Sequence, residues 1–275
     1  MGIAYKKLTE NGKTFVKNNI NSNSISGNKT MNADFSLYFT IYPPLRSTTN
    51  FLWKSNIVNN VTTFADNLIA WYDKYASEYE LDANMLAAQG YSESHFKIWE
   101  FSKNKNGSPA AMGLTQFMPA TIYGIIVSNG YGILPKFTND EINKITKNIT
   151  QSYLDSKFSP YNQDKLKNAP ILLQNLIDNP ELLVKAQARY MKYCANKGNS
   201  LASSALFGYN RGDGLIKSTY FATVQAGANY RDGYEKEGVD YVYKVFKLLY
   251  DSFGYKDLGM DKPTPNFDIH SANLA

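Results

Sequence analysis

The chain of 275 residues carries a formal net charge of +5, and 43% of its residues are hydrophobic. This hydrophobic fraction supports a substantial core and excludes a chain that is disordered throughout. The basic residues are scattered and form no stripe with aromatic side chains, so we expect no nucleic-acid binding. Polar or charged residues interrupt every apolar run, so we expect no membrane insertion.

Residues 1–50 are predicted to form a low-complexity N-terminal arm. The Asn/Ser-rich tract from Asn18 to Asn28 has almost no hydrophobic period. Such a composition buries too little apolar surface to offset the entropy of the chain. The aromatic segment from Phe35 to Pro44 is expected to dock as an extended piece on the domain or on a partner.

A mainly α-helical domain is predicted over residues 51–254, because strand-type alternation is scarce. Apolar residues at three-four spacing predict a helix from Val61 to Tyr79. Asp82 is a candidate N-cap for a second helix that runs toward Phe96. Further helices are predicted from Pro180 to about 197, from about 201 to 208, and from 234 to 253.

Short helices and loops are expected over 121–149, and residues 125–180 are interpreted as an insertion that could build a lid, widen a groove or dock a partner. Residues 255–275 are expected to form a polar C-terminal tail.

The few cysteine and histidine residues argue against a disulfide and against a zinc site. Cys194 is the one cysteine, so a disulfide within the chain is impossible, and it is expected to be a small buried residue. His95 and His270 are the two histidines, and their separation matches no zinc-ligand pattern. We therefore expect no metal and no cofactor.

Two segments carry the chemistry that the sequence suggests. The first is Tyr91–Phe96, which offers a single carboxylate, Glu93, near the end of a predicted helix. The second is the glycine-opened turn Gly113–Thr121, whose polar side chains could face that carboxylate across a cleft. An isolated Glu beside uncharged polar neighbours suits acid catalysis at a glycosidic bond better than metal binding or phosphate chemistry.

Four motifs in order resemble those of the soluble lytic transglycosylase (SLT) family. They are Glu93-Ser94, the Gly113–Thr121 turn, Gly208-Tyr209-Asn210-Arg211-Gly212, and Glu237 with Tyr241-Val242. The resemblance covers about 81–246. It implies a goose-type lysozyme-like fold and cleavage of peptidoglycan glycan strands.

The resemblance also implies a role for each matched residue. Glu93 would be the sole catalytic acid and base, and Tyr209 would place its hydroxyl close to that carboxylate. Glu237 would be a structural pin. The substrate-binding residues implied in this way are Ser94, Gln116, Met118, Tyr209, Asn210 and Tyr241.

This chain departs from the family pattern at several positions. Thr115 stands where the family usually has Met, Gly208 where it has Ala, and Arg211 where it has a small residue.

By the same resemblance, Glu93 protonates the leaving oxygen, and the sugar's own C6 hydroxyl then attacks to form a 1,6-anhydro ring. One alternative is a hydrolytic muramidase, which would need Asp213 or Asp232 to hold water. Another is a catalytically inert structural protein of a virion or secretion complex.

The resemblance and the absence of a signal-peptide pattern suggest where the protein acts. We expect it on a virion, or delivered to the bacterial wall or periplasm without a signal peptide. Its expected partners are peptidoglycan strands. Other proteins of a virion or secretion complex are candidates through the arm or the tail.

Overall fold

The computed structural model describes residues 4–34, 46–103, 109–155, 164–198, 202–216 and 233–256. These residues are mainly helical, as predicted, with two small antiparallel sheets. The helices, in chain order, are α1 (Glu10–Asn19), α2 (Ser22–Ile25), α3 (Val61–Glu78), α4 (Ala83–Ser94), α5 (Pro119–Ile122), the π-helix η1 (Tyr123–Val127), α6 (Asn139–Thr146), α7 (Gln151–Asp155), α8 (Asp164–Asp178), α9 (Pro180–Lys197), α10 (Ala202–Arg211), the 3₁₀ helix η2 (Asp213–Leu215) and α12 (Gly233–Ser252). The strands are β1 (Ser26–Asp34) paired with β2 (Arg46–Lys54), and β3 (Phe101–Lys103) paired with β4 (Pro109–Met112).

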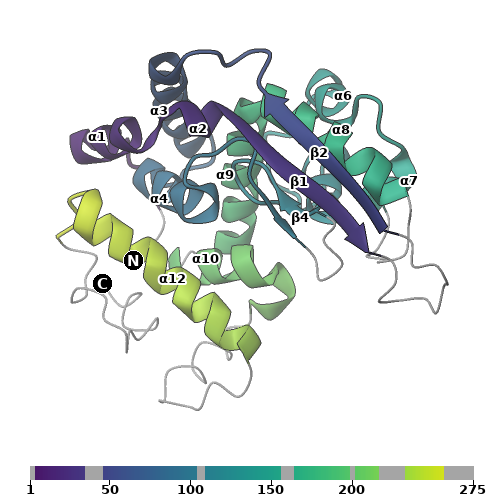
Figure 1. Cartoon of the computed structure of the whole chain (residues 1–275). Helices are drawn as coiled ribbons and strands as arrows, with labels where there is room; N and C mark the ends of the chain where they lie inside the picture. The colour runs from purple at the N-terminus through teal and green to yellow at the C-terminus, as the bar shows by residue number, and fades with distance from the viewer. Residues whose placement is uncertain are drawn as a thin grey trace.

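Five long helices make up the centre of the molecule. Helix α9 packs on α3 and α10, while α12 crosses both α4 and α10 (Figure 1). The β1–β2 hairpin lies apart from α12 and packs on α8 (Figure 1). In the described ranges, none of the helices is both long and apolar enough to cross a membrane.

Helix α4 is buried on almost every side, which explains its composition. Asp82 caps it, as predicted, by accepting a hydrogen bond from the Asn84 backbone N–H at 2.9 Å. Small residues let α3 approach closely: a Cβ at Gly90 would lie 2.1 Å from the Tyr72 hydroxyl oxygen. A helix enclosed in this way gives the side chains at its end a rigid support.

The prediction of a low-complexity arm outside the domain was wrong for residues 4–34, which are folded into the domain. Leu8, Val16 and Ile20 are buried in the same core as the central helices. The Thr9 backbone N–H donates to Asn84 Oδ1 at 2.9 Å, so the segment is tied to the start of α4. The Asn/Ser tract supplies helix caps: Asn21 caps α2 in a capping box.

The predicted boundary between the N-terminal arm and the domain, at residue 51, lies within β2. This strand pairs with β1 of the predicted arm, so the boundary is wrong. The segment Phe35–Pro44 lies outside the described residues.

The start of the predicted C-terminal tail is also anchored. Tyr255 donates its hydroxyl hydrogen to Asp82 and accepts a hydrogen bond from Asn84 Nδ2 at 3.2 Å. Residues 257–275 lie outside the described part of the chain.

Arg189 of α9 organises the first part of the predicted insertion. Its guanidinium is buried and donates to the backbone carbonyls of Ile125, Asn129, Gly130 and Ile133 at 2.6–3.2 Å. One side chain thus donates to a carbonyl of η1 and to three carbonyls of the irregular backbone that follows it. This part of the insertion is fixed against α9.

Replacement of Arg189 by Met should destabilise the protein by about 3 kcal/mol, because one buried and three partly buried carbonyls lose their donor. Urea unfolding followed by circular dichroism measures the loss, and hydrogen exchange should localise it to 125–133. Lys17→Met is a matched control, since the ion pair that Lys17 forms with Asp66 is exposed. It should cost less than about 1 kcal/mol. A loss for Arg189→Met no larger than the control would contradict this account.

Candidate functional site

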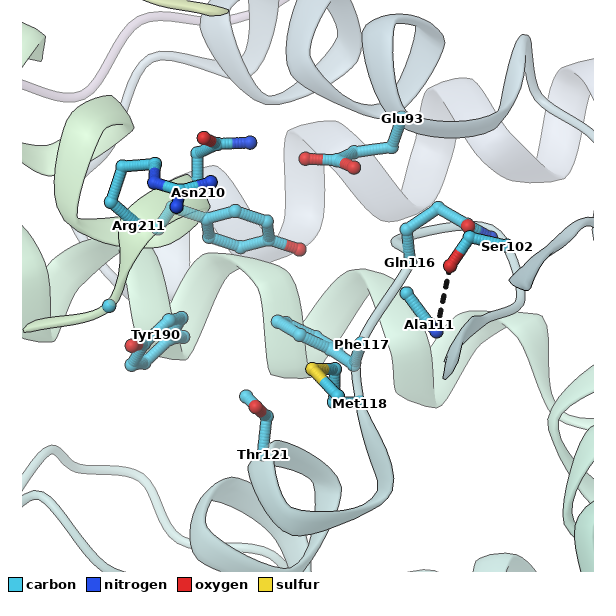
Figure 2. A pocket seen from close by; sticks show the side chains of 12 residues that line it. Glu93, Ser102, Ala111, Gln116, Phe117, Met118, Thr121, Tyr190, Asn210 and Arg211 are labelled. Carbon is cyan, nitrogen blue, oxygen red and sulfur yellow. Dashed lines mark hydrogen bonds between the residues drawn. The ribbon is translucent and has the colours of Figure 1, made fainter. Parts of the chain in front are cut away.

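The cleft beside Glu93 has a volume of about 420 Å³, which suits a small ligand or part of a polymer. Its walls come from α4, the 113–118 turn, α5, α9 and α10, together with one residue each from β3 and β4. The lining residues are Glu93, Ser102, Ala111, Gln116, Phe117, Met118, Thr121, Tyr190, Tyr209, Asn210, Arg211 and Gly212. Figure 2 shows the Glu93 carboxylate entering from one side, with Asn210 and Arg211 on a second side and Gln116 to Met118 along a third.

Glu93 lies in the last turn of α4, where the helix ends abruptly. His95 and Phe96 both adopt the left-handed conformation, with φ of 54° and 59°, and Phe96 is fully buried. The chain therefore turns away directly after the helix and leaves the Glu93 side chain at the edge of the cleft.

Burial sets the protonation of Glu93. Loss of solvent raises its pKa from 4.5 to about 7, although the Tyr241 hydrogen bond and the nearby Lys244 ammonium both favour the charged form. A carboxyl group with this pKa is present in both forms at neutral pH. It can therefore donate a proton in one step and accept one in the next.

Tyr241 of α12 is the hydrogen-bond partner of this carboxylate. Its hydroxyl donates to Glu93 Oε1. Tyr209 lines the cleft, but its hydroxyl donates to the Thr115 carbonyl oxygen at 2.9 Å. The Tyr209 hydroxyl lies near enough to Glu93 for the carboxylate charge to raise the pKa of Tyr209, as expected. Its hydrogen bond holds the turn, however, and the hydroxyl that bonds directly to Glu93 is that of Tyr241.

Ser94 also differs from its predicted role. It is buried and does not line the cleft. Its hydroxyl donates to the Leu114 carbonyl oxygen at 2.8 Å, which ties the end of α4 to the 113–118 turn. Ser94 therefore positions the turn and is not placed to bind a ligand in the cleft.

Gln116 lines the cleft as predicted, in an unusual backbone conformation with φ of 50°. Its Nε2 donates to the carbonyl oxygens of Glu100 and Gly113 at 3.0 and 2.9 Å. Both hydrogens of the amide are thus used, so only its Oε1 can receive a hydrogen bond from a ligand. Gly113 permits the turn, because its φ is +76° and a Cβ there would lie 2.8 Å from Leu183 Cδ1.

Met118 and Asn210 also line the cleft, as expected. Within the described part of the chain, the buried Asn210 Oδ1 has no hydrogen-bond partner. Figure 2 shows the amide nitrogen of Asn210 on the side of Glu93, so this nitrogen is the atom that can donate a hydrogen bond to a ligand beside the carboxylate.

The sequence interpretation assigned no role to Arg211 or Tyr190. Arg211 lines the cleft and forms an ion pair with Glu237 at 2.6 Å. This contact joins α12 to α10, and the role of a structural pin for Glu237 stays a prediction. Tyr190 packs in the ring cluster of Phe117 and Tyr209 beneath the cleft. Its position in the apolar run of α9 gave no signal that distinguished it from a core residue.

Cys194 and the acidic residues suggest no second chemistry. Burial raises the pKa of the Cys194 thiol, which disfavours the thiolate. Asp213 accepts hydrogen bonds from the Tyr193 hydroxyl and the Lys197 ammonium, both at 2.8 Å, and does not line the cleft. The described residues contain no cluster of His, Cys, Asp and Glu able to hold a metal ion.

Comparison with known proteins returned no match among protein-family models, curated proteins or solved structures.

Glu93→Gln should stabilise the folded protein at alkaline pH. The folded pKa lies above the unfolded value, so the folded state loses stability as pH rises from about 4.5 to about 7. At about 1.4 kcal/mol per pH unit, this difference corresponds to about 3 kcal/mol. Denaturant unfolding should show the variant more stable by about this amount at pH 8 and similar to wild type at pH 4. Equal stabilities at both pH values would contradict a buried, ionising Glu93.

Tyr241→Phe should raise the pKa of Glu93 by about 1 unit, because the charged form loses its hydrogen bond. The ¹³C chemical shift of the Glu93 carboxyl carbon, assigned by comparison with Glu93→Gln, measures this value. Tyr209→Phe is the matched control, since its hydroxyl bonds to Thr115, and the pKa of Glu93 should stay within about 0.3 unit. Equal shifts of the Glu93 pKa in the two variants would contradict the assignment of Tyr241 as the direct hydrogen-bond partner of Glu93.

Proposed function

We propose that this protein is a peptidoglycan lytic transglycosylase that cleaves the β-1,4 bond between MurNAc and GlcNAc and leaves 1,6-anhydro-MurNAc ends. The observation that carries the proposal is a half-buried carboxyl group, with a pKa of about 7, at the wall of a polar and aromatic cleft. Among the described residues that line this cleft, Glu93 is the only acid. The motif resemblance supports the same reaction, and the goose-type lysozyme-like fold is part of the proposal.

In the first step, protonated Glu93 donates its proton to the glycosidic oxygen as the bond from that oxygen to C1 of MurNAc breaks. The GlcNAc portion leaves as an alcohol, and positive charge develops at C1. The Glu93 carboxylate then takes the proton of the MurNAc C6 hydroxyl, whose oxygen bonds to C1. The products balance without water, and Glu93 is protonated again for the next cycle.

The cleft contacts suit a sugar chain. Gln116 Oε1 is an acceptor for sugar hydroxyl or amide hydrogens, and the amide nitrogen of Asn210 on the other wall is a donor. Met118 and Phe117 supply apolar surface beside them. Such a mixture of amides and apolar groups is typical of carbohydrate sites, because a pyranose has polar edges and apolar faces.

Non-hydrolytic cleavage is favoured over a muramidase by the position of Asp213. A hydrolase that inverts or retains configuration uses a second carboxylate near the scissile bond. Asp213 is held by Tyr193 and Lys197 outside the cleft lining, and these contacts lower its pKa. Asp232, the other candidate, lies outside the described residues.

The expected site of action follows from the proposed substrate. The protein would act on the bacterial cell wall, as part of a virion or after delivery to the periplasm. Its modest positive charge of +5 would favour adsorption to an anionic wall at low ionic strength.

Digestion of purified peptidoglycan, followed by mass spectrometry without borohydride reduction, tests the proposal directly. We expect muropeptides lighter by one water than ordinary reducing-end products. Hydrated reducing ends would replace the proposal with a muramidase. Retained wall binding without products from several wall types would indicate an inert structural protein.

Glu93→Gln is the decisive variant for this assay. It should reduce cleavage below detection while it keeps the fold and wall binding, because the amide can neither donate nor accept the catalytic proton. Asp213→Asn is the matched control and should retain at least about half of the activity, since its carboxylate lies outside the cleft lining. The reverse pattern would assign catalysis to Asp213.

A further inference from the structure

Arg211 brings a positive charge to the cleft. It is the last residue of α10, and its side chain lines the cleft beside Asn210 (Figure 2). Among the described residues of the lining, Arg211 is the only cation and Glu93 the only acid. The proposed reaction gives this positive charge no role, because the glycosidic bond and the hydroxyl groups around it are neutral.

Helix α12 holds the Arg211 side chain in place. The stem of the arginine lies close to Gly238, where a Cβ would be 2.6 Å from Arg211 Cγ. This close approach buries the stem, and the whole side chain is only 8% exposed. An arginine restricted in this way loses little further conformational entropy when it binds a ligand. The guanidinium is therefore preorganised at the wall of the cleft.

Glu237 of α12 shows that a carboxylate fits this guanidinium. Its Oε2 lies 2.6 Å from Arg211 Nη1, although the Glu237 side chain is itself 62% exposed. A guanidinium has five N–H donors in a planar fork, so it can contact more than one carboxylate. A well-solvated partner such as Glu237 can also yield its place to a ligand at little cost.

The proposed substrate carries carboxylates on one side of one of its two sugars. MurNAc differs from GlcNAc by a lactyl group, which ends in a carboxylate when no peptide is attached. When a stem peptide is attached, the nearest carboxylates belong to that peptide. We propose that Arg211 is a binding residue that recognises a carboxylate on the lactyl side of MurNAc. This assignment rests on the proposed function, because it names the anionic part of the same substrate.

Recognition of this carboxylate would determine which bond lies at Glu93. A glycan strand alternates two sugars and so contains two kinds of β-1,4 bond. A shift of the strand by one sugar would bring the wrong bond to the carboxyl group. Because only every second sugar carries the lactyl group, a contact between that side of MurNAc and Arg211 fixes the register of the strand. Arg211 is thus a specificity-determining residue.

The experiment measures the binding of three soluble sugars by NMR titration of the ¹⁵N-labelled protein at low ionic strength. They are N-acetylmuramic acid, its methyl ester, and N-acetylmuramoyl dipeptide with one carboxylate. The ester keeps the sugar and the lactyl group but removes the charge. We expect the acid or the dipeptide to bind about tenfold more tightly than the ester, and the one that does so identifies the source of the carboxylate. Equal dissociation constants, or no binding of any of the three, would overturn the proposal.

Arg211→Met is the decisive variant. Methionine keeps an apolar stem beside Gly238 and removes the guanidinium. The preference for the carboxylate should fall to less than about twofold, while the affinity for the ester stays unchanged. Lys197→Met is the matched control, because Lys197 is paired with Asp213 and does not line the cleft. An equal loss of preference in both variants would assign the effect to the overall charge of the protein and overturn the proposal.

Glu237→Gln replaces this test if Arg211→Met does not fold. The change leaves the arginine in place and removes the carboxylate that competes for it. The affinity for the carboxylate-bearing sugar should then rise by about two- to threefold, with no change for the ester. An unchanged preference in Glu237→Gln would overturn the proposal in that case.

These titrations need no cleavage, so they separate the binding role of Arg211 from the proposed reaction. A preference that depends on Arg211, in a protein that releases no muropeptides, would keep the binding role and reject the transglycosylase. Cleavage to 1,6-anhydro ends without any preference for the carboxylate would keep the transglycosylase and reject the role of Arg211.

Discussion

The hydrogen bond from Tyr241 to Glu93 is the contact on which the geometry of the site depends. It joins residues 148 apart in the chain and links the last helix, α12, to the buried helix α4. A carboxyl group in this position loses solvation, and its remaining stabilisation comes from one hydroxyl and one nearby ammonium. The site therefore requires α12 to be docked, although most of the cleft lining comes from other elements.

Side chains that donate hydrogen bonds to backbone carbonyls hold the irregular segments around the cleft in place. The Ser94 hydroxyl donates to the Leu114 carbonyl, the Tyr209 hydroxyl donates to the Thr115 carbonyl, and Arg189 donates to one carbonyl in η1 and to three after it. These segments have no helical or sheet partners for their polar groups, and an unpaired carbonyl in the interior is costly. Polar side chains in the core thus give loops the fixed shape that a preorganised site needs.

The N-terminal segment shows why composition misleads when polar residues act as caps. An Asn/Ser tract usually indicates too little apolar surface for folding, yet Asn21 and Thr9 each begin a helix here. Leu8, Val16 and Ile20 of this segment are buried, and Phe15 is partly buried against the same core. They are spaced too widely for a local pattern, and their partners lie on α3, α4 and α12, far along the chain.

By itself, the sequence determined what depends on near neighbours. The helices of residues 61–78, 83–94 and 180–197 follow from apolar spacing and from signals such as Asp82 and Pro180, which act within one or two turns. The candidate carboxylate and the Gly113 turn were likewise visible as local motifs. Only the tertiary structure decided that Tyr241 contacts Glu93 and that Ser94 and Tyr209 hold the turn. These contacts join helices distant in sequence, and their geometry is set by how whole helices pack, which no local pattern encodes.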